Sequence, residues 1–350
     1  SSSEEIETIS EFNTAEELAV TNSRVDGLEA RLNNFEAGSF SETTTASFST
    51  DMYLGAVDGG TSTADDAVMS GYSFQIDLNT SFTGEDSLDI SLDAGNSGIA
   101  GISEFDGNSL GDGLRVDGVT YTFPIGDKTT VFVGDNTNGD TLYSTACVYG
   151  GPSNTLDDCG NASSALGSGQ GTAAGASYDF GNGFTGAVGY TGDGSTAASG
   201  LMTAEGFDAA GLQLAYAADS YGVSVSYAGI ESAEDTTYWG LNGYWTPSET
   251  GSVPSVSVGY EFGSPENGNP DTSHYFVGLQ WEEVGPGTFG TALGTKTPVA
   301  DTAEELLMYE AFYSYPINDG MTITPLVYIK EFAAATADET GVMVKTSFSF

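Results

Sequence analysis

The chain has 350 residues, and its 7 Lys and Arg against 50 Asp and Glu give a formal net charge of −43. This balance excludes a nucleic-acid partner, because binding to phosphates needs clustered Lys and Arg. Aromatic residues at 11% separate the chain from disordered acidic tails. With one histidine and two cysteines, the chain has too few His and Cys ligands for a zinc site. Only one histidine could act as a catalytic base. We therefore expect no enzymatic activity, no cofactor and no metal.

Residues 1–38 are predicted to form a separate helical segment. Its apolar residues recur every seven positions in two rows, formed by Leu18, Val25 and Leu32 and by Leu28 and Phe35. Such a heptad pattern is typical of a coiled coil, which would join copies of the chain. The alternative is a short amphipathic helix that lies on the main domain.

Residues 39–350 have a period of two instead. Ile76 and Leu78 flank Asp77, for example, and this alternation is typical of half-buried strands. Sixteen segments share the pattern, near residues 43–54, 69–80, 86–94, 115–123, 128–134, 171–179, 183–190, 210–217, 221–229, 236–246, 253–261, 272–282, 286–294, 306–315, 321–330 and 341–350.

Long and short connections alternate between these segments. Long ones include residues 95–114, 135–169 and 191–209, and short ones include 181–182 and 218–220. An up-and-down antiparallel barrel in an outer membrane has this rhythm, with long external loops and short periplasmic turns. No apolar run is long enough for a membrane helix, and the mean hydropathy is −0.13. The predicted fold is an all-β, 16-stranded antiparallel transmembrane β-barrel.

The alternation also predicts which charged residues line the channel that a barrel of this size encloses. The acidic candidates are Asp51, Asp77, Asp89, Asp93, Glu282 and Glu310. The basic candidates are Lys330 and Lys345, on the last two strands, and Arg115, at the outer end of the fourth. Excess carboxylates favour cation entry. The alternative is that most acidic residues lie on the external surface, where they are solvated and do not affect selectivity.

Cys147 and Cys159 lie twelve positions apart in the third long connection. One disulfide explains them better than a metal pair, and it indicates an oxidising compartment. The acidic pairs Asp65-Asp66, Asp157-Asp158 and Glu234-Asp235 match no calcium loop, so we interpret them as solvated acids. His274 begins a strand and is expected to be a polar residue of the rim.

The run ELAVTNSRVDGLEARLNNFEAGSFSETTTASFS, most specifically residues 21–31, resembles the junction between coil and first strand of cyanobacterial outer-membrane porins. That family joins an S-layer-homology domain to a carbohydrate-selective-type porin barrel. The final Phe350 is similar to the carboxy-terminal signal for outer-membrane assembly. The resemblance implies a homotrimer, passive permeation, a periplasmic N-terminal segment, and a third external loop that constricts the lumen. Residues 1–12 are too few for the S-layer-homology domain, so a peptidoglycan link would need a domain before Ser1.

The sequence therefore predicts an outer-membrane porin, in contact with lipid, that passes small hydrophilic solutes and inorganic ions with a preference for cations. One alternative is a secreted or surface-layer acidic β-protein that binds calcium or polysaccharide. Another, a hydrolase on a barrel, would depend on His274 at the rim.

Overall fold

The computed structural model describes residues 43–61, 67–99, 101–166, 170–194, 200–203, 206–232, 234–249, 251–333 and 336–350. The chain divides into two compact units, Ser1–Ala46 and Ser47–Phe350. The second unit is the barrel. The predicted coil residues Leu18, Val25, Leu28, Leu32 and Phe35 lie outside the described residues, as does the pair Asp65-Asp66.

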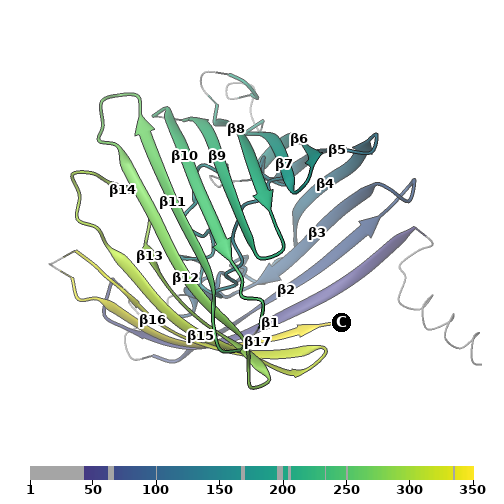
Figure 1. The fold of residues 1–350 in the computed structure, drawn as a ribbon. Helices are drawn as coiled ribbons and strands as arrows, with labels where there is room; N and C mark the ends of the chain where they lie inside the picture. Colours follow the sequence, from purple (N-terminus) through teal and green to yellow (C-terminus); the bar gives the residue numbers. More distant parts are fainter. Residues whose placement is uncertain are drawn as a thin grey trace, which may run out of the picture. The chain divides into compact units, whose positions relative to one another are not determined.

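The described part of the chain is built from antiparallel strands (Figure 1). They are β1 (Thr44–Asp58), β2 (Met69–Thr80), β3 (Ser87–Gly95), β4 (Arg115–Ile125), β5 (Thr129–Thr137), β6 (Gly171–Gly181), β7 (Phe184–Gly192), β8 (Asp208–Ala217), β9 (Tyr221–Glu231), β10 (Thr236–Trp245), β11 (Ser255–Pro265), β12 (Thr272–Val284), β13 (Gly287–Thr295), β14 (Val299–Ala300), β15 (Leu307–Asn318), β16 (Met321–Lys330) and β17 (Glu339–Ser349). A single 3-10 turn, η1 (Ser103–Phe105), interrupts the connection between β3 and β4 in this described part.

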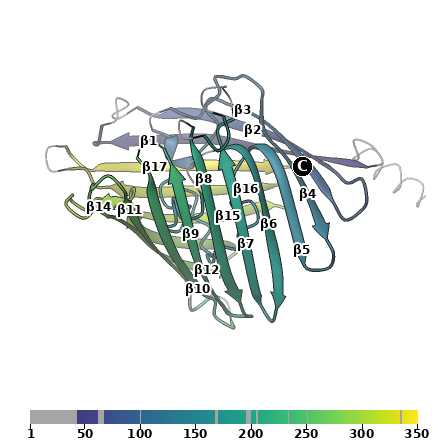
Figure 2. The ribbon, with the colours of Figure 1, turned by 90° about the horizontal axis from the view of Figure 1, so that it is seen from above.

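The long strands pair with their neighbours in chain order, and β17 pairs with β1 from Ser49 opposite Ser349 to Asp58 opposite Thr340. This last pairing closes the sheet, so the described residues confirm the predicted barrel of sixteen long antiparallel strands. In Figure 2 the teal and green strands β5–β10 form one wall and the purple strands β1–β3 lie on the other side. The two-residue β14, which pairs with β12, was not predicted, because periodicity cannot reveal so short a strand.

The two faces of the wall differ in chemistry. Along β9, Tyr221, Val223 and Val225 are 47%, 49% and 38% exposed on the outer face. Ser224 and Ser226, which alternate with them, are buried on the inner face. The outer face is thus apolar, and the inner face carries polar or small residues. This distribution is the opposite of that in a soluble barrel and matches a barrel that faces lipid.

Aromatic residues also face outward, among them Trp239 and Tyr260 within their strands and Trp245 at the end of β10. No helix in the described ranges is long and apolar enough to cross a membrane. Successive connections lie at opposite ends of the barrel, because each strand reverses direction, and the longest connections share one end. Two of these connections, residues 96–114 and 138–170, are called here the β3–β4 loop and the β5–β6 loop. Their described residues, 96–99, 101–114 and 138–166, contact the inner wall and form the candidate site.

Candidate functional site: the loop-lined interior

The first half of the β5–β6 loop runs along the inner wall from β8 to β12. Its backbone amides donate hydrogen bonds to polar side chains of β8, β9, β11 and β12. The pairs are Ser144 N to Gln213 Oε1 at 2.6 Å, Ala146 N to Ser224 Oγ at 2.9 Å, Val148 N to Ser257 Oγ at 3.0 Å, and Gly150 N to Gln280 Oε1 at 2.9 Å. The wall therefore replaces the backbone partners that an irregular segment lacks.

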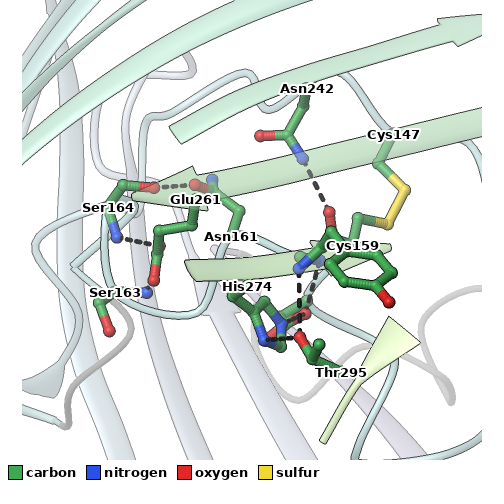
Figure 3. A network of polar contacts seen from close by, with 12 residues as sticks. Cys147, Cys159, Asn161, Ser163, Ser164, Asn242, Glu261, His274 and Thr295 are labelled. Carbon is green, nitrogen blue, oxygen red and sulfur yellow. Dashed lines mark hydrogen bonds and ion pairs between the residues drawn. A yellow bond between two sulfur atoms is a disulfide. The ribbon is translucent and has the colours of Figure 1, made fainter. Parts of the chain in front are cut away.

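The second half of the loop returns along β11 and β10 (Figure 3). The Glu261 carboxylate accepts hydrogen bonds from the amides of Ser163 at 2.8 Å and Ser164 at 2.7 Å. The Asn242 amide donates to the carbonyl oxygen of Cys159 at 2.9 Å. Glu261 is 1% exposed, so the loop covers it completely.

A disulfide between Cys147 and Cys159 joins the two halves of the loop, as predicted. Glycines in the wall let the loop backbone approach closely. A Cβ atom at Gly259 would collide with the Cys159 carbonyl oxygen, and one at Gly189 with that of Gly139. Part of the high glycine content of the strands therefore serves this contact.

Tyr149 anchors the loop to the far side of the barrel. Its ring packs 5.3 Å from that of Phe276 and 5.9 Å from that of Phe312, between centroids. Its hydroxyl donates a hydrogen bond of 2.6 Å to Glu310, which is 3% exposed. The loop therefore covers Glu310, one of the predicted pore residues.

The β3–β4 loop also folds inward. Phe105 packs against Tyr53 of β1 with ring centroids 5.7 Å apart, and Lys345 of β17 lies above the Phe105 ring, 5.8 Å from its centroid. Glu104 forms an ion pair with Lys330 of β16. The charge of Lys330, one of the predicted pore residues, is therefore compensated by a carboxylate of the loop.

The wall of β1 to β3 carries acidic residues whose partners are neutral. Asp77 accepts hydrogen bonds from Gln75 at 2.8 Å and from Ser91 at 2.7 Å. Asp89 accepts from Asn79 at 2.5 Å and from Ser87 at 2.7 Å, and Asp51 accepts from Tyr53 at 3.4 Å. Because these donors carry no charge, they orient the carboxylates without cancelling the negative charge.

The remaining predicted pore residues are spread over the interior. Asp93 is buried opposite the exposed Arg115 in the pairing of β3 with β4, at the end of the long connections. Glu282 is exposed near the short turns, where it accepts hydrogen bonds from Gln280 and Thr288. The structure thus places Asp77, Asp89 and Asp93 on the paired strands β2 and β3, where Asp93 lies opposite Gln75, and places Glu282 on the separate strand β12.

The expectation for His274 was wrong. Its side chain is 2% exposed and lies beneath the β5–β6 loop, where Nδ1 shares a hydrogen bond of 2.9 Å with Thr295 and Nε2 lies 3.5 Å from Asp158 (Figure 3). The loop covers this position, which sequence alone places at a strand end. A rim hydrolase that depends on an accessible His274 is not supported.

The β5–β6 loop borders a cavity of about 410 Å³ whose acidic lining residues are Asp140, Asp157 and Asp158. Burial, with the charges of Asp158 and Asp106, raises the pKa of Asp157 to about 7, and burial raises the pKa of Asp140 to about 6. Among the described residues, no group of three or more His, Cys, Asp or Glu side chains is placed to hold a metal ion.

The sequence analysis missed Glu104, Glu261 and Gln213. Glu104 lies in a non-periodic loop, so no pattern marked it. Glu261 and Gln213 do follow the alternation of their strands and were detectable as inward polar residues. Their partners in the loop were not detectable.

Neither protein-family models nor curated proteins match the chain. Solved structures match over most of its length. OprB of Pseudomonas putida has a TM-score of 0.62 at 12% identity, covering 88% of this chain and 94% of that chain. The fold is that of bacterial outer-membrane porins. An anion-selective porin of Comamonas acidovorans has a TM-score of 0.59 at 14% identity, covering 88% of this chain and 99% of that chain. A loop L8 deletion variant of OmpT, an outer membrane protein of Vibrio cholerae, has a TM-score of 0.59 at 11% identity. The match covers 88% of this chain and 100% of that chain.

Proposed function

We propose that this protein is an outer-membrane porin, a passive diffusion channel for small hydrophilic solutes and inorganic ions with a preference for cations. The observation that carries the proposal is the β5–β6 loop, which is bonded along the inner wall of a closed barrel whose outer face is apolar. A loop fixed in this way narrows a barrel of sixteen strands, which otherwise encloses an aqueous channel.

The cation preference follows from the charges that remain uncompensated. Asp51, Asp77 and Asp89 have neutral hydrogen-bond partners, whereas Lys330 is paired with Glu104. Carboxylates along a narrow path raise the local concentration of cations. The anion selectivity of the Comamonas porin does not transfer to this chain at 14% identity.

Shortening the β5–β6 loop tests the constriction. Deletion of residues 144–160 removes the part bonded to β8–β12, so the single-channel conductance in planar bilayers should rise. Shortening the connection between β11 and β12 by residues 266–270 is the control, because this segment contributes none of the wall contacts described above. An unchanged conductance in the first variant would place the constriction elsewhere.

The outer-membrane location and a homotrimer belong to the same proposal. The apolar outer face should require detergent for extraction, which a secreted acidic β-protein would not. Leu18, Val25, Leu28, Leu32 and Phe35 would form the trimer coil in the periplasm, and Phe350 would be the assembly signal. Removal of residues 1–37 should weaken trimers in native mass measurements and leave the barrel folded, whereas a variant that fails to fold would contradict this separation.

A further inference from the structure

The β3–β4 loop places one carboxylate deep inside the barrel. Glu104 lies in η1, and its side chain is 5% exposed where it pairs with Lys330, whose side chain is 17% exposed. The two residues lie 226 positions apart in the chain, so the pair depends on the loop's position inside the barrel.

Contacts on both sides of Glu104 hold it in this position. Ile102 is completely buried, close to Gly55 of β1 and Gly71 of β2. Phe105 packs against Tyr53, and the amide of Asn154 in the β5–β6 loop donates a hydrogen bond of 2.9 Å to the Glu104 carbonyl oxygen. The loop therefore presents the Glu104 carboxylate to one lysine of the wall.

We propose that Glu104 is a specificity-determining residue of the pore, because it cancels the charge of Lys330. This inference rests on the proposed porin function and deepens it. An uncompensated ammonium group inside a low-dielectric wall attracts anions and repels cations over several ångströms. Glu104 cancels the field of Lys330, so this lysine does not oppose the carboxylates of β1–β3.

Lys296 differs from Lys330 in this respect. It donates a hydrogen bond of 2.8 Å to the Glu331 carbonyl oxygen and lies 3.6 Å from the centroid of the Phe332 ring. A carbonyl dipole and a ring lower the cost of burying the charge but do not neutralise it. Lys330, in contrast, has a direct carboxylate partner in Glu104.

The test is the reversal potential of Glu104→Gln in planar bilayers across a salt gradient at pH 6. Lys330 loses its counter-charge, so the cation-to-anion permeability ratio should fall on the order of three-fold. Glu85→Gln, in the exposed turn after β2, makes the same change in net charge and should leave the ratio unchanged. The double variant Glu104→Gln, Lys330→Met should restore the wild-type ratio, which a merely structural role of Glu104 would not produce.

Two results would overturn the inference: a Glu104→Gln ratio equal to that of Glu85→Gln, or a double variant that keeps the shift. If Glu104→Gln fails to assemble, Lys330→Gln decides alone, because it leaves the Glu104 charge uncompensated and should raise the ratio about three-fold. An unchanged ratio in that variant also overturns the inference. Absence of channels in the wild-type protein would instead refute the proposed porin function.

Discussion

The Glu261 carboxylate of β11 accepts a hydrogen bond of 2.7 Å from the backbone amide of Ser164, 97 positions away in the chain. The adjacent amide of Ser163 shares the same acceptor oxygen. One buried wall side chain thus holds the returning half of the β5–β6 loop.

Glu261→Ala should loosen this half of the loop. Two buried N–H groups lose their acceptor, at roughly 1–3 kcal/mol for each group that stays unsatisfied. We expect a lower melting temperature and more open-channel noise in single-channel recordings. Glu266→Ala, in the exposed connection after β11, is the matched control and should change neither quantity. Noise at the wild-type level in Glu261→Ala would show that the loop does not depend on this contact.

Removal of the disulfide should weaken the loop more than the barrel. The bridge closes a segment with a separation of 12 positions, for which loop-closure entropy predicts a stabilisation of about 3 kcal/mol. Cys147→Ser with Cys159→Ser should therefore allow faster proteolysis between residues 138 and 166, while the strands remain protected. Mass spectrometry of the fragments identifies the cleavage sites. Equal cleavage rates with and without the bridge would contradict this expectation.

Gly259→Ala should displace the loop from the wall. The added Cβ atom collides with the carbonyl oxygen of Cys159, which is a backbone atom and cannot rotate away. Single-channel conductance should change, and melting should occur at a lower temperature. Gly229→Ala in β9 is the control, because its Cβ atom would meet open space. Identical behaviour of the two variants would argue against close seating of the loop on β11.

Selectivity should depend on pH through Asp157. Burial and the charges of Asp158 and Asp106 raise its pKa from 3.8 to about 7, so it is largely protonated at pH 5 and charged at pH 9. The cation-to-anion permeability ratio should increase as the pH rises through about 7, and Asp157→Asn should flatten this increase. The charged carboxylate also destabilises the loop above about pH 7, and this penalty disappears as the pH falls towards 3.8. A pH profile that Asp157→Asn leaves unchanged would rule out this group.

The sequence predicts the strands of the barrel wall better than it predicts the loops that fold inside the barrel. Alternation such as that around Asp77 identifies the strands and turns Glu310 and Lys330 inward, because side chains of a strand alternate strictly between faces. It cannot show that Tyr149 covers Glu310 or that Glu104 neutralises Lys330. Those partners come from loops without periodicity, and their positions depend on tertiary contacts over more than a hundred residues.

The burial of His274 has the same origin. Its place at the start of β12 is readable from the sequence, but the loop that covers it is not. The β5–β6 loop was expected in the lumen only through the family resemblance. Its hydrogen bonds with Gln213, Ser224 and Ser257 now supply the physical reason.

The reversal potential of the purified wild-type protein in a planar bilayer, recorded across a salt gradient, tests the central claim most directly. We expect stable conductance steps and a reversal potential of the sign for cation preference, because Asp51, Asp77 and Asp89 accept hydrogen bonds from neutral donors while Lys330 is paired with Glu104. Absence of conductance steps, or a reversal potential of the sign for anion preference, would contradict it.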